Sequence, residues 1–90
     1  MRESREVKEA REWYLKAKAT LPPQPKAVSQ RAGCKVAWYT YRTMAEAKIA
    51  AQHARLDAEW YSFLGYDFGY QQPGFISQDK KRRRYEVTFP

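Results

Sequence analysis

The sequence predicts a small single-domain α+β protein, in which two helices lie on one face of a mainly antiparallel, three-stranded sheet. Its 90 residues leave room for only one hydrophobic core. Two segments show helical periodicity, and three shorter segments are rich in β-branched or aromatic residues. The expected order of elements along the chain is therefore α-β-α-β-β.

The N-terminal segment, residues 1–20, is predicted to form an amphipathic helix. Its charges alternate at helical spacing, and its thin apolar stripe comprises Val7, Ala10, Tyr14 and Ala17. Such a helix is marginally stable alone, so it needs a surface to pack on. Residues 21–33 follow as a basic linker, with three prolines between positions 22 and 25 that disfavour a helix.

The core is predicted to span residues 34–90, beginning with a strand at 35–42. Thr43 and Glu46 then form a Thr-x-x-Glu capping pattern, which predicts the start of a helix covering 44–64. Gly65 is a suitable left-handed residue to end it. A loop at 65–74 leads to hairpin strands at 75–78 and 84–89.

The helix at 44–64 has two contrasting faces. A bulky face contains Ala45, Ile49, His53, Leu56, Trp60 and Phe63, and a roughly opposite face contains Ala47, Ala51, Ala54, Ala58 and Tyr61. We expect the bulky face to pack on the sheet and the alanine face to allow close approach of another helix. That second helix could be the N-terminal helix or the same face of another copy, so a homodimer through the alanine face is one possibility.

The formal net charge of +7 is distributed unevenly. Residues 21–42 contain four cations and no anion, whereas residues 43–79 contain two cations and five anions. Residues 80–90 contain five cations and one anion. A positive field of this kind favours polyanions such as DNA or RNA, or an acidic protein surface.

Several classes of protein are disfavoured by the sequence. No apolar run approaches the length of a membrane span, and a single cysteine cannot form an internal disulfide, so we expect a cytoplasmic protein without a membrane partner. His53 and Cys34 lack neighbours that would indicate catalysis, and no metal-binding or phosphate-loop spacing occurs. We therefore expect no enzyme activity, cofactor or metal.

The candidate binding residues are cations and aromatic side chains. The cationic candidates are Lys80, Lys81, Arg82, Arg83, Arg84, Lys35, Arg42 and Arg31. The aromatic candidates are Tyr39, Tyr41, Tyr66, Phe68 and Tyr70, together with Trp38 and Tyr85 if these face outward. Cations neutralise phosphates, and exposed rings stack on unpaired bases. The alternatives are that the cations form only a solvated turn and that the loop aromatics cover the core.

The function that this pattern favours is a small, non-enzymatic basic binding protein. It would act on nucleic acid, or on a nucleic-acid-handling complex, through the cationic hairpin. The alternative is an inhibitor or adaptor of the kind made by phages and mobile elements, for example an anti-CRISPR or other counter-defence protein. Such a protein would direct the same basic, aromatic surface at an acidic groove of a host protein.

Overall fold

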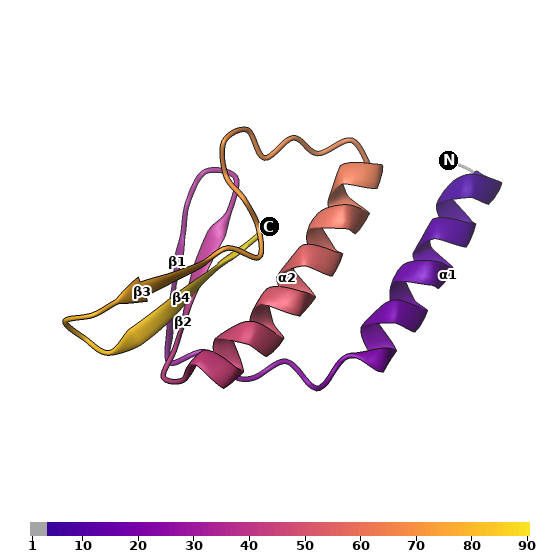
Figure 1. Ribbon diagram of the computed structural model, residues 1–90. Helices are drawn as coiled ribbons and strands as arrows, with labels where there is room; N and C mark the ends of the chain where they lie inside the picture. The colour runs from indigo at the N-terminus through magenta and orange to yellow at the C-terminus, as the bar shows by residue number, and fades with distance from the viewer. Residues whose placement is uncertain (1–3) are drawn as a thin grey trace.

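The computed structural model describes residues 4–90, so residues 1–3 of the predicted N-terminal helix lie outside the described part. The fold has three layers (Figure 1): a four-stranded antiparallel sheet, a helix packed on one face of it, and a second helix packed on the first. The helices are α1 (Arg5–Thr20) and α2 (Met44–Phe63). The strands are β1 (Ser29–Ala32), β2 (Ala37–Tyr41), β3 (Ile76–Asp79) and β4 (Arg84–Phe89), arranged in the order β1-β2-β4-β3.

The α+β class and the antiparallel sheet are confirmed, but the prediction of three strands was wrong. β1 lies within the predicted linker, so the order of elements is α-β-β-α-β-β. All four residues of β1 are exposed, which means that the strand has no apolar face that a sequence pattern could reveal. It is held by its backbone pairing with β2, and the connecting turn is closed by a 2.7 Å hydrogen bond from the Gly33 amide to the Val36 carbonyl.

Helix α2 begins where the capping pattern predicts. The Thr43 hydroxyl accepts a 3.1 Å hydrogen bond from the Glu46 amide and donates one of 2.9 Å to the Glu46 carboxylate. The helix ends at Phe63, and Gly65 has a positive φ of 96°. This left-handed conformation suits glycine and lets the chain turn away from the helix axis.

The core lies between the alanine face of α2 and the adjacent face of the sheet. Four alanines of the helix are fully buried there against aromatic and aliphatic side chains of β2 and β4: the buried cluster comprises Tyr41, Ala47, Ala50, Ala51, Ala54, Val87 and Phe89. Alanine is small enough to bring a helix backbone close to a layer of large rings. The large side chains of this core therefore come from the sheet.

This packing reverses the predicted orientation of α2. The alanine face meets the sheet, whereas the face containing His53 and Trp60 meets α1 and the linker. The prediction of a homodimer through the alanine face is consequently wrong for this fold, because Ala47, Ala51 and Ala54 are at most 1% exposed. Helical periodicity identified both faces but could not show which of them the sheet would cover.

Helix α1 packs on α2 and runs in the opposite direction (Figure 1). The predicted stripe of Val7, Ala10, Tyr14 and Ala17 is its half-buried side. The Tyr14 ring stacks on Trp60 with a centroid distance of 5.5 Å, and the Tyr14 hydroxyl donates a hydrogen bond to Asp57. Asp57 also forms a 2.8 Å ion pair with Lys18.

The environment of Tyr14 favours its neutral phenol. Burial raises the pKa of Tyr14, and the hydrogen bond to the Asp57 carboxylate and the negative charge of that group raise it further. Tyr14 therefore remains a hydrogen-bond donor across the whole neutral pH range.

The proline-rich linker is attached to the core and does not form a free arm. The Nε2 atom of His53 lies 2.6 Å from the Pro22 carbonyl oxygen, and because a carbonyl can only accept, Nε2 must donate. His53 is 5% exposed. Its role in the structure is thus to hold the start of the linker against α2.

Enlarging a buried alanine tests the close packing between α2 and the sheet. We expect Ala51→Leu to lower the free energy of unfolding by about 1–3 kcal/mol, because the added methylenes must displace sheet side chains or the helix. Ala45→Leu is the matched control, since Ala45 is exposed on the same helix and should tolerate leucine. Urea unfolding followed by circular dichroism measures both, and equal stability of the two variants would contradict this packing.

Removal of Asp57 tests the docking of α1. We expect Asp57→Ala to lower the free energy of unfolding by about 1–3 kcal/mol, because the Tyr14 hydroxyl and the Lys18 ammonium both lose their acceptor. Amide hydrogen exchange should accelerate across α1 more than across α2. Glu59→Ala, at an exposed position of the same helix, is the control. Unchanged exchange in α1 would show that this contact does not hold the helix.

Candidate functional site

The sheet face opposite α2 is open. Within residues 4–90, both helices lie on the other side of the sheet. Because side chains alternate along a strand, the residues that flank the core positions of β2 and β4 point toward this open face. They form rows across the paired strands: one row comprises Arg31, Trp38, Thr88 and Phe75, and the next comprises Ser29, Thr40, Glu86 and Ser77.

Arg31 and Trp38 are paired residues of β1 and β2 whose side chains contact each other on the open face. The Arg31 guanidinium carbon lies 4.2 Å from the centroid of the Trp38 ring, and its Nη2 atom is 3.2 Å from a carboxylate oxygen of Glu86. The indole ring lies against the backbone at Gly33, where an added Cβ would come within 2.6 Å of a ring atom. The position of the Trp38 ring thus depends on glycine at this turn.

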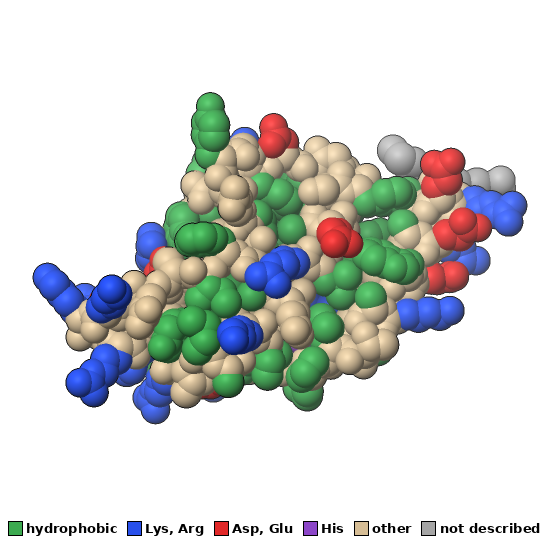
Figure 2. Space-filling view, viewed as in Figure 1, with side chains coloured by type: hydrophobic (Ala, Val, Ile, Leu, Met, Phe, Trp, Pro, Cys, Tyr) green, Lys and Arg blue, Asp and Glu red, His purple; other side chains and the backbone are tan. Residues whose placement is uncertain are grey.

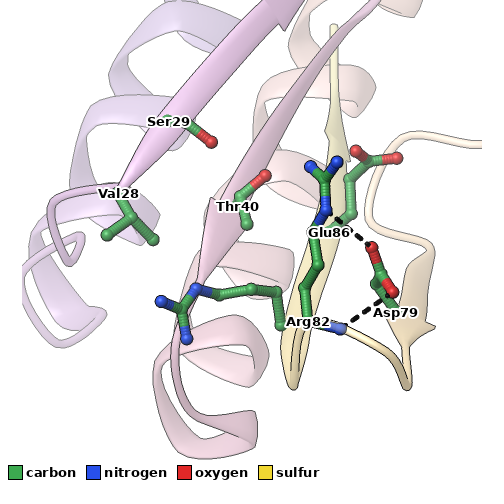
Figure 3. A pocket seen from close by; sticks show the side chains of 7 residues that line it. Val28, Ser29, Thr40, Asp79, Arg82 and Glu86 are labelled. Carbon is green, nitrogen blue, oxygen red and sulfur yellow. Dashed lines mark hydrogen bonds and ion pairs between the residues drawn. The ribbon is translucent and has the colours of Figure 1, made fainter.

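Beside this pair, a hollow of about 490 Å³ opens toward the end of the sheet where β4 begins (Figure 3). Its lining includes Ser29 and Thr40 hydroxyls, the Asp79 and Glu86 carboxylates, and two arginines, Arg82 and Arg84. Arg82 reaches back toward Asp79, with 3.9 Å between Nε and the carboxylate oxygen. The hollow therefore combines hydroxyl groups with cations that are only partly neutralised.

The cationic run forms the turn between β3 and β4. One carboxylate oxygen of Asp79 accepts hydrogen bonds from the backbone amides of Lys81 and Arg82, at 3.1 and 3.2 Å, and Arg83 has a positive φ of 53°. These contacts use the backbone, so the side chains of Lys80 to Arg83 remain exposed. Figure 2 shows the resulting group of basic side chains at the end of the molecule formed by this hairpin.

A second hollow, of about 340 Å³, lies at the other end of the open face. It is lined by three aromatic side chains, two amides and two hydroxyls: Trp38, Tyr70, Phe75, Gln71, Gln72, Ser77 and Thr88. Tyr70 is fully exposed and Phe75 is 57% exposed. The hollow is formed where the loop after α2 returns to the sheet, with the backbone of Gly74 and Phe75 hydrogen-bonded to Thr88.

The structure brings most of the predicted cations together. Lys80 to Arg84 form the β3–β4 turn and the start of β4, and Arg42 follows β2 at the same end of the sheet. Arg31 lies on β1, in contact with Trp38. Lys35 is separate, because it lies in the β1–β2 turn at the opposite end, close to Gly69.

The predicted aromatic contacts are divided among different surfaces. Tyr41 is 1% exposed and cannot contact a partner, which corrects the prediction; Tyr39 faces the helix side, stacked on Phe89 at 4.4 Å. Tyr66 packs edge-on against Tyr61 at the C-terminal end of α2, and Phe68 is half-buried in the loop. Of the five, only Tyr70 borders the open face.

Sequence reasoning missed the residues that complete the second hollow. The sequence predicts a strand that includes Phe75 and Ser77 but no binding role for them, and it does not mark Gln71, Gln72 or Thr88 as binding residues. The alternation of Phe75 and Ser77 was the available signal, since residues two apart share one face of a strand. No alternating pattern marks Gln71 and Gln72, because they lie in a loop.

Two further kinds of feature, metal-ion clusters and membrane-spanning helices, were sought among the described residues. Among residues 4–90, no group of three or more His, Cys, Asp or Glu side chains could hold a metal ion. No described helix has the length and apolar character needed to cross a membrane. The chain matches no protein-family model, no curated protein and no solved structure.

Proposed function

We propose that this protein binds nucleic acid through the open face of its sheet and the cationic β3–β4 turn. One observation carries the proposal. Arg31, stacked over Trp38, lies on the same helix-free face as the arginines of the 490 Å³ hollow. Cations that contact phosphates release counterions and provide affinity without sequence preference. We propose no catalytic step.

The distribution of charge supports a polyanionic ligand. The acidic residues of α2, including Asp57 and Glu59, belong to the layer behind the sheet. On the open face, the two carboxylates of Asp79 and Glu86 are each paired with an arginine. The turn therefore carries an excess of positive charge, which projects from one end of the sheet. This charge can attract and orient a nucleic-acid strand.

Removal of two turn lysines tests this proposal. We expect Lys80→Ala/Lys81→Ala to weaken binding of a labelled oligonucleotide and to reduce the slope of log affinity against log salt by up to about 2, since each lost phosphate contact removes about 0.7–0.9. The turn should persist, because Asp79 binds the backbone amide at position 81. Fluorescence anisotropy at several salt concentrations measures both quantities.

The matched control is Lys8→Ala/Lys16→Ala. It removes the same charge from α1, the layer most distant from the open face. Equal losses of affinity in the two double variants would indicate that only net charge matters. Binding that does not respond to salt in the unmodified protein would contradict the proposal.

Neutralising Glu86 should strengthen oligonucleotide binding, whereas removing the turn lysines should weaken it. We expect Glu86→Gln to increase affinity for an oligonucleotide by about twofold to tenfold, because it removes a negative charge from the open face and releases Arg31. Stability should change little, since the pair is partly exposed. Anisotropy titration at low salt measures the change, and weaker binding would mean that the ion pair positions Arg31 for the ligand.

A second candidate is a protein adaptor or inhibitor. It is favoured by an exposed apolar group at the C-terminal end of α2, comprising Tyr61, Phe63, Leu64 and Tyr66, which the proposed nucleic-acid surface does not use. Affinity capture with and without nuclease separates the two. A stoichiometric protein retained after nuclease treatment supports the adaptor, whereas loss of all partners supports direct nucleic-acid binding.

A further inference from the structure

We propose that the hollow beside Trp38 is a subsite for an unpaired nucleobase, so that the protein prefers single strands to duplexes. This inference rests on the proposed function and names its ligand more closely. Its starting point is the 340 Å³ hollow, which combines exposed rings with amide and hydroxyl groups on a face that also carries cations.

The aromatic side chains of the hollow can supply stacking surfaces. Tyr70 projects fully into solvent, and Phe75 presents more than half of its surface at the edge of the same hollow. Neither ring stacks on another aromatic side chain of the described residues. Nucleobases stack on such rings with little dependence on base identity. The hollow can therefore receive a base that its own strand leaves unstacked.

The polar groups of the hollow match the edge of a base. Gln71 and Gln72 each carry an amide that donates and accepts hydrogen bonds, and the hydroxyls of Ser77 and Thr88 do both as well. No hydrogen bond within the described residues engages these four side chains. An unpaired base can offer the donors and acceptors of its Watson–Crick edge to such groups, whereas pairing occupies that edge in a duplex.

The cations of the open face can contact the phosphate backbone of the nucleic acid whose base occupies the hollow. The Arg31 guanidinium, 63% exposed, lies over Trp38 at the border of the hollow, and Arg84 and Arg82 continue along the face toward the turn. Arg84 lies four residues before Thr88 on β4, and a strand rises about 3.3 Å per residue, so the two positions are about 13 Å apart. A bound single-stranded nucleic acid therefore passes from the rings to the cations within a few nucleotides. A duplex can reach these cations, but its stacked bases cannot enter the hollow.

The test compares single strands with a duplex of the same sequence. Fluorescein-labelled 12-nucleotide RNA, DNA and duplex DNA are titrated against the unmodified protein and Tyr70→Ala/Phe75→Ala. We expect the unmodified protein to prefer both single strands, and the variant to lose roughly tenfold or more in affinity for them, with its duplex affinity unchanged. Similar losses for RNA and DNA indicate base stacking, whereas a loss confined to RNA indicates that the sugar is also read.

Two controls keep the result interpretable. Phe63→Ala/Tyr66→Ala removes the same two ring types from exposed positions at the end of α2 and should leave binding unchanged. Tyr70→Ala alone affects a side chain that is fully exposed, so it tests the subsite even if the double variant is unstable. Tyr70→Phe should retain binding, since the stacking ring is preserved.

The outcomes distinguish the two proposals. If the unmodified protein binds none of the oligonucleotides, both proposals fail. If it binds duplex and single strands equally, and Lys80→Ala/Lys81→Ala weakens binding while Tyr70→Ala does not, the proposed function stands and the base subsite is overturned.

Discussion

The α2 alanines pack closely against the aromatic and aliphatic side chains of β2 and β4, and this contact joins the helical layers to the sheet. The helix backbone approaches Tyr41, Val87 and Phe89 because its own side chains there end at Cβ. Among residues 4–90, this single layer of contact contains every buried hydrophobic side chain except Val36. A larger side chain at these alanine positions would separate helix and sheet and weaken the whole core.

This arrangement also explains why one sheet face stays open. The bulky side of α2 is directed away from the sheet, where Trp60, Asp57 and His53 receive α1 and the linker. Since α1 is used as a third layer on α2, no described helix remains to cover the opposite side of the sheet. The open face is therefore a consequence of how the apolar surface of α2 is divided between its two neighbours.

The cationic turn is compatible with folding because its charges need no burial. Asp79 orders the turn through two backbone amides, and the like-charged side chains diverge into solvent. The cationic run can therefore be both a solvated turn and a binding surface. A turn built on backbone hydrogen bonds leaves its side chains free for an anionic ligand, and the neighbouring hollows give that ligand a surface to follow.

Both helices, the start of α2 at the Thr43 cap, and the β3–β4 hairpin with its cationic turn were predictable from the sequence alone. These features depend on residues within a few positions of one another, so periodicity and capping chemistry suffice to find them. Long-range contacts were needed to show that residues 29–32 form a strand, that the alanine face meets the sheet, and that Tyr41 is buried while Trp38 and Phe75 share the open face. These features depend on pairing and packing between residues far apart in the chain, and an exposed strand such as β1, or a helix with two apolar faces, carries no local signal of which partner it will meet.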